Sequence, residues 1–157
     1  MASNQQIINR QLNEIASYID KKDIKNPLVS KATVGWHLAH LLKVMEAVHY
    51  GLEVSKPEDY KPTLNFKKIF VFVLGKIPRG KARAPKSVVP EEDMDQPTLE
   101  LKVQEAIQKF SEFEKLSETA NFKHPYFGYL NKTKTLKFLR IHNEHHLKIV
   151  RDVVVDK

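Results

Sequence analysis

Apolar residues recur every three or four positions along four long stretches of the chain, and this feature most constrains the fold. The four stretches are residues 3–21, 30–54, 98–118 and 131–155. Such spacing places apolar side chains on one face of an α-helix, and each such face must be buried against another element. The pattern therefore predicts an all-α fold, an antiparallel four-helix bundle.

Shorter signals indicate where these helices begin. Ser3 and Gln6 have the spacing of a capping box, in which two side chains satisfy the free amides of a first helical turn. Ser30 and Asn131 are expected to cap the second and the last long helix.

The segment between the second and third long helices is less regular. Residues 65–77 have helical spacing and predict a short extra helix, although the β-branched and aromatic residues 69–73 would also suit a short buried strand. Residues 78–97 contain four prolines and no periodicity, so they predict a long proline-rich connection. We expect a solvated surface loop there rather than a functional lid or an anion clamp.

The chain has 157 residues, enough for one domain with its own core, so residues 1–157 are expected to form a single bundle domain. It has no cysteine, which leaves nitrogen or oxygen to hold any metal. No secretory signal is recognisable, and the longest apolar run, residues 69–74, is far shorter than the roughly 20 residues of a membrane span. We therefore expect a soluble, cytoplasmic protein with no membrane partner.

Two of the seven histidines lie four residues apart in the last predicted helix. His142 and His146 therefore share one helix face, with about 5–6 Å between their β-carbons, and both rings can reach one metal ion. Leu139 and Val150 lie beside them, so the pair is expected to point into the bundle, where unpaired polar rings would be costly. His145 is three residues from His142, the other spacing that places two side chains together.

A third ligand should come from a facing helix. The second long helix offers His37 and His40, and spacing alone favours neither. The alternative is that all these rings are hydrogen-bonded histidines without a metal, which is the usual state of a buried polar side chain.

Three motifs carry a resemblance to a known family. They are His40-Leu41, His124-Pro125-Tyr126-Phe127-Gly128 and His142-Asn143-Glu144-His145-His146-Leu147. Together with Ile77-Pro78-Arg79-Gly80, they resemble one branch of the DinB-like superfamily of metal-binding helical bundles (the DinB/YfiT-like fold), over nearly the whole chain.

The resemblance implies a specific metal centre. Its ligands would be His40, His142 and His146, its metal would be nickel or zinc, and His37 and His145 would be neighbours of the site. Two positions depart from the family pattern. Ile149 stands where the superfamily often has glutamine, and Thr135 stands where the branch usually has tryptophan. The missing glutamine removes a polar neighbour of the metal.

Three imidazoles leave at least one position of a divalent ion open, as in catalytic zinc sites. The bundle is also similar to those of thiol-dependent transferases and isomerases. Both points predict a metal-dependent enzyme with a small-molecule substrate, which transfers a thiol or hydrolyses a bond. Since the chain lacks cysteine, any thiol must be an exogenous low-molecular-weight compound. His124, Tyr126 and Glu46 are candidates for an acid, a base or an orienting group, although we expect Tyr126 and Phe127 to pack at a helix entrance.

Two other hypotheses belong to different functional classes. A basic module could bind nucleic acid or another anion through its net charge of +7 and the cluster Lys76, Arg79, Lys81, Arg83 and Lys86. No recognition-helix pattern or aromatic platform accompanies these residues, so nucleic acid is not the expected partner. Alternatively, the metal only stabilises the bundle. Pairing of two copies into a homodimer through helix faces is a further expectation.

Overall fold

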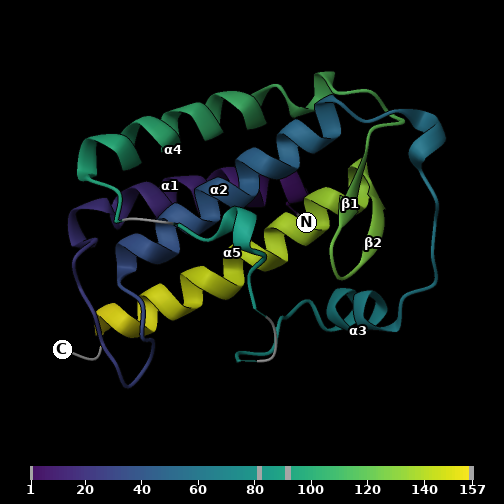
Figure 1. Ribbon diagram of the computed structural model, residues 1–157. Coiled ribbons are helices and arrows are strands. Elements are labelled where there is room, and N and C mark those ends of the chain that lie inside the picture. Colours follow the sequence, from purple (N-terminus) through teal and green to yellow (C-terminus); the bar gives the residue numbers. More distant parts are fainter. Residues whose placement is uncertain (1, 81–82, 91–92, 156–157) are drawn as a thin grey trace.

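The computed structural model describes residues 2–80, 83–90 and 93–155, and these residues form five α-helices and one β-hairpin (Figure 1). The helices are α1 (Asn4–Ser17), α2 (Val34–Glu53), α3 (Phe66–Leu74), α4 (Gln96–Ser111) and α5 (Lys132–Val155), and the strands are β1 (Asn121–His124) and β2 (Gly128–Asn131). The prediction of a mainly helical protein is confirmed, and the expectation of an all-α fold is wrong at the hairpin. None of the helices in the described part of the chain combines the length and the apolar character of a membrane span.

The four long helices form a bundle in which α1 and α2 each pack against both α4 and α5. Their directions do not simply alternate. Figure 1 shows α1 and α5 running one way and α2 and α4 the other. Neighbours are therefore antiparallel in two cases, α1 with α4 and α2 with α5, and parallel in the other two. The expectation of an antiparallel bundle holds only for the first two pairs. The reason is the long connection through α3, which returns the chain to the starting end of α2, as crossover connections do in other bundles.

The helix starts follow from capping side chains. Ser3 and Gln6 form the predicted capping box, and Asn131 accepts a hydrogen bond from the Lys134 amide at the start of α5. The prediction for Ser30 is wrong, because α2 begins three residues later and Thr33 caps it. The Val34 and Gly35 amides donate to the Ile24 and Lys22 carbonyls. These hydrogen bonds tie the start of α2 to the preceding loop.

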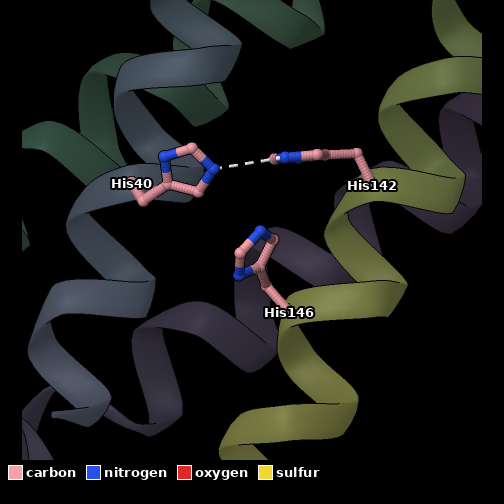
Figure 2. Close-up of side chains that lie close together, drawn as sticks. All are labelled: His40, His142 and His146. Atoms are coloured by element: carbon pink, nitrogen blue, oxygen red, sulfur yellow. Dashed lines mark hydrogen bonds between the residues drawn. The ribbon is translucent and has the colours of Figure 1, made fainter. Parts of the chain in front are cut away.

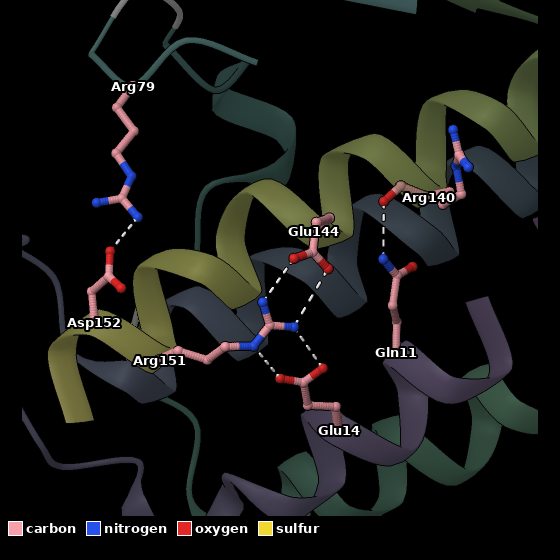
Figure 3. A network of polar contacts seen from close by, with 7 residues as sticks. All are labelled: Gln11, Glu14, Arg79, Arg140, Glu144, Arg151 and Asp152. Atoms are coloured by element: carbon pink, nitrogen blue, oxygen red, sulfur yellow. Dashed lines mark hydrogen bonds and ion pairs between the residues drawn. The ribbon is translucent and has the colours of Figure 1, made fainter. Parts of the chain in front are cut away.

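A polar network fixes how α5 is rotated against α1 (Figure 3). The Arg151 guanidinium donates to both carboxylate oxygens of Glu14 on α1, at 2.7 and 2.8 Å, and to Glu144, two turns earlier on α5, at 2.7 Å. Gln11 donates to the Arg140 carbonyl at 3.0 Å. At about 100° per residue, Glu144 and Arg151 lie on the opposite side of α5 from His142. The network therefore turns the histidine face of α5 toward α2.

The hairpin explains the motif from His124 to Gly128. Nδ1 of His124 accepts hydrogen bonds from the Tyr126 and Phe127 amides, at 3.1 and 3.2 Å, and the His124 ring stacks on Phe127. Gly128 has a φ of +69°, a conformation that favours glycine. Phe127 is buried as expected, whereas Tyr126 is 45% exposed and donates its hydroxyl proton to the Arg83 carbonyl. The motif thus builds a turn.

Because Nδ1 of His124 accepts two hydrogen bonds, protonation of this ring should cost stability. Burial lowers the pKa of His124 to about 4 from an ordinary value of 6.5. The unfolded chain therefore binds a proton at His124 as the pH falls from 6.5 toward 4 and the folded chain does not, so folding loses up to about 3 kcal/mol over that window. In His124→Asn the amide oxygen can still accept in the turn, but this position no longer titrates.

Between pH 6.5 and 4, the free energy of unfolding measured with urea should fall more for the unchanged protein than for His124→Asn. The difference should reach up to about 3 kcal/mol. Lys123→Asn, one residue earlier in β1, is the matched control and should keep the pH dependence of the unchanged protein. An identical pH dependence in the His124 variant would contradict this account of the turn.

Candidate metal centre

The antiparallel contact of α2 with α5 brings three histidines together. His40 lies on α2, and His142 and His146 lie one turn apart on α5. One ring nitrogen of each lies within 4.8 Å of the other two. Figure 2 shows the three rings pointing toward a common space between the helices. The structure thus brings together all three residues named as ligands from the sequence, and they could hold one metal ion.

The protonation of His40 can be assigned from its contacts. Nδ1 of His40 lies 2.9 Å from the carbonyl oxygen of Val88, and a carbonyl can only accept, so this nitrogen carries the proton. In the neutral ring Nε2 then holds a lone pair. That Nε2 lies 3.3 Å from Nε2 of His142. Two nitrogens bound to one tetrahedral zinc at 2.0–2.1 Å are about 3.3–3.4 Å apart, so the spacing suits a shared ion.

A chain of hydrogen-bonding groups leads outward from His146. Its Nδ1 lies 2.9 Å from Nδ1 of His37, and Nε2 of His37 lies 3.0 Å from the hydroxyl of Ser30. Since Nδ1 of His146 is engaged with His37, Nε2 is the nitrogen left for the space shared with His40. Of the two candidates on α2, His40 faces the space shared with His142 and His146, whereas His37 contacts Nδ1 of His146.

His142 is held mainly by packing. Its ring centroid lies 5.5 Å from Phe138 and 4.8 Å from His146. Its Nδ1 is buried and has no hydrogen-bond partner among the described residues. On the α2 side, the Trp36 ring stacks on His40 with the two planes 13° apart. Aromatic surfaces therefore surround the three rings and restrict their rotation.

The electrostatics keep the rings neutral. Burial lowers the pKa of His40, and the hydrogen bond to Val88 opposes that shift only in part. Burial first, and then the charges of neighbouring histidines, lower the pKa of His142 and His146 well below the usual value. Burial and the neighbouring charges of His40, His145 and Arg79 lower the pKa of His37 to about 4. Neutral imidazole is the form that binds metals.

The connection between α2 and α4 takes part in the site. Val88 and Pro90 are buried, and the Val88 and Val89 carbonyls accept hydrogen bonds from His40 and Lys43 of α2. The expectation of a solvated loop is therefore wrong for this part of the connection. The physical reason is that Val88 supplies an apolar side chain to the core and a carbonyl to a buried ring.

The other candidates lie outside the triad. His145 is partly buried beside His146, and a hydrogen bond with the Ile77 backbone opposes the burial that lowers its pKa. His124 contacts Phe138, which in turn contacts His142. Glu46 lies between α2 and α4, 3.4 Å from the Lys102 ammonium, so it does not reach the centre.

The two departures from the family pattern have structural roles. Ile149 is buried in the core and Thr135 is fully buried. The Thr135 hydroxyl donates to the Asn131 carbonyl at 2.9 Å, inside the first turn of α5. Neither side chain brings a polar group to the three rings.

The basic cluster of the connection includes both paired and exposed side chains. Arg79 pairs with Asp152 of α5 at 2.6 Å, as Figure 3 shows. Arg83 and Lys86 are exposed, and Lys81 lies outside the described residues.

Comparison with known proteins identifies a family. No curated protein and no solved structure matches the chain. A protein-family model, described as a protein of unknown function (DUF1569), matches residues 28–153. This span contains α2, the long connection, the hairpin and all three histidines of the centre. The relationship to the DinB-like superfamily stays a prediction. The chain belongs to the DUF1569 family.

Proposed function

We propose that the protein binds one divalent metal ion, nickel or zinc, through Nε2 of His40, His142 and His146, and that it is a metal-dependent enzyme with a small-molecule substrate. The observation that carries the proposal is the convergence of three neutral imidazoles from two helices. Nitrogen ligands of this kind suit zinc and nickel.

The contacts of His40 support a cation in the shared space. Its proton is on the side of Val88, so a lone pair faces Nε2 of His142 at 3.3 Å. Without a cation, one of the two facing nitrogens must carry a proton to avoid the repulsion of two lone pairs. A metal ion satisfies both nitrogens at once and also uses the lone pair of His146.

Three protein ligands favour a reactive site. Closed structural zinc sites use four ligands, whereas catalytic sites use three and keep one position for a water or a substrate. His146 is only partly buried, so the centre lies near the bundle surface. A divalent ion held there would lower the pKa of a water or of a thiol. Since the chain has no cysteine, the thiol of a transfer reaction would come from a small exogenous molecule.

The proposed ligand set predicts how metal content responds to mutation. The purified protein should contain about one nickel or zinc ion per chain, and His142→Ala should lose it because two imidazoles bind weakly. His145→Ala, the matched control on the same helix, should keep its metal since His145 lies outside the triad. Elemental analysis measures both, with circular dichroism to verify folding. Metal retained in His142→Ala, or lost equally in both variants, would refute the ligand assignment.

The open position predicts a second, spectroscopic result. Cobalt exchanged into the site should give a visible spectrum that changes when a small thiol such as 2-mercaptoethanol is added, because a thiol that binds a metal is deprotonated and becomes a ligand. Ethylene glycol, which lacks the sulfur, is the control and should leave the spectrum unchanged. A spectrum that does not respond to the thiol would favour a closed, purely structural metal.

His37 should position His146 for the metal. A ligand histidine commonly donates its second ring proton to a neighbouring acceptor, and loss of such a partner weakens metal binding by about 10–100-fold. We expect that loss in His37→Ala, measured by competition with a chelator, and partial rescue in His37→Gln, whose amide oxygen can accept the His146 proton. His49→Ala removes another buried histidine of α2 and should leave the affinity unchanged. Unchanged affinity in His37→Ala would show that His37 only fills space.

A further inference from the structure

Helix α3 directs its apolar face away from the protein. Its two buried residues are Lys68 and Val71. Five large apolar residues are between 42% and 79% exposed: Phe66, Ile69, Phe70, Val73 and Leu74. Leu64, just before the helix, is 78% exposed. A helix on a globular protein normally turns its apolar stripe toward the core, so α3 is reversed.

The exposed residues form one continuous stripe. At about 100° per residue, they cover an arc of about 140° around the helix axis. Val71, Lys68 and the partly buried Phe72 occupy the opposite side. Phe72 contacts Phe127 of the hairpin turn and Lys137 of α5, so this side is the one attached to the body of the protein. Apolar residues clustered in this way mark an interaction site more often than scattered ones do.

Local contacts fix both ends of the helix. The Asn65 side chain accepts a hydrogen bond from the Lys68 amide at 2.9 Å, and Gly75 ends the helix with a φ of +62°, a common way to terminate helices. The Lys68 ammonium donates to the Thr63 carbonyl at 3.0 Å, and Asn65 donates to the Tyr126 carbonyl at 2.9 Å. These contacts present the stripe on a fixed support.

The stretch of chain that contains α3 is strongly positive. From Tyr60 to Pro90 the chain has eight lysines and arginines and no acidic residue, which exceeds the net charge of +7 of the whole protein. The rest of the chain is therefore close to neutral. Lys61, Lys67 and Lys76 are exposed on or beside α3, and Lys67 borders the apolar stripe on the helix wheel.

This charge argues against a second copy of the chain as the occupant. In a two-fold dimer each patch meets an identical patch, so the lysines around one stripe would face those around the other. Like charges placed together at an interface are unfavourable. An occupant that is both apolar and negatively charged avoids this repulsion.

We propose that α3 docks the protein onto the surface of an anionic lipid bilayer. The apolar stripe would enter the boundary between headgroups and acyl chains, as in amphipathic helices that lie in the membrane plane. Lys61, Lys67 and Lys76 would contact the anionic headgroups. The sequence-based expectation of no membrane partner rested on the lack of a spanning segment, and a surface-bound helix needs none.

Vesicle binding tests the proposal on the full-length protein. The protein should float with vesicles that contain phosphatidylglycerol and phosphatidylcholine, and remain unbound with phosphatidylcholine alone. Each lysine near an anionic surface contributes about 5-fold in affinity, so Lys67→Gln with Lys76→Gln should weaken binding by about 25-fold. Phe70→Glu with Val73→Glu should abolish flotation. Leu101→Glu, an exposed apolar residue of α4, is the matched control and should bind as the unchanged protein does.

Three outcomes would overturn the proposal. The first is no flotation with anionic vesicles. The second is a concentration-dependent dimer in light scattering that Phe70→Glu with Val73→Glu dissociates, which would make a second copy the occupant. The third is a sign that the surface binds polyanions in general. Either the lysine variant loses flotation while the Phe70 and Val73 variant keeps it, or short duplex DNA abolishes flotation by competition. The lysine variant changes exposed side chains only, so it reports on binding even if the apolar variant does not fold.

Discussion

The contact between α2 and α5 is the constraint on which the candidate centre depends. His40 meets His142 only because the two helices run in opposite directions and α5 is rotated toward α2. Arg151 contributes to that rotation from the far side of α5, where it binds Glu14 of α1 and Glu144 of its own helix. An ion-pair network at the bundle surface, where charged groups stay hydrated, thus helps to orient polar rings in the interior, where an unpaired polar group costs free energy.

The hydrogen bonds at the outer nitrogens of the rings determine which nitrogens face the centre. An imidazole with an unassigned proton can present either an N–H or a lone pair to its neighbour. Val88 removes that freedom for His40, and the chain through His37 to Ser30 restricts it for His146. Nδ1 of His142 has no hydrogen-bond partner among the described residues, and this ring is held by Phe138 and the neighbouring histidines instead. Two of three proposed ligands are therefore oriented by polar contacts and one by packing.

Much of this could be predicted from the sequence, and the limit has a physical cause. Helical spacing located the long helices, and the i, i+4 spacing of His142 and His146 placed both on one face, because these are properties of a single helix. The choice between His37 and His40 needed the direction and rotation of α2 relative to α5, which spacing within one helix cannot supply. The family resemblance named His40, and the structure explains why His37 lies behind His146.

Other features escaped the sequence because backbone or tertiary contacts create them. Side-chain patterns cannot show that the Val88 backbone carbonyl accepts a hydrogen bond from His40, so the connection was expected to be solvated. The hairpin was missed since its strands are four residues each and the His124 side chain, rather than a common turn sequence, closes the turn. The exposure of the apolar face of α3 could not be predicted for a similar reason. Its apolar spacing correctly predicted a helix, but spacing does not say which side the protein covers.

The positions of the carboxylates in the described part of the chain bear on the proposed chemistry. Within the described part of the chain, the only ion pair between a histidine and an acidic residue joins His49 and Glu53, outside the centre. Glu144 turns toward Arg151, and Glu46 turns toward Lys102. Among residues 2–80, 83–90 and 93–155, the partners of the proposed ligands are a carbonyl and a neutral histidine, so no carboxylate of these residues offsets the charge of a bound divalent ion. An uncompensated cation attracts anions and lowers the pKa of a bound group most strongly. That property would suit the thiolate of the proposed reaction, formed from an exogenous thiol.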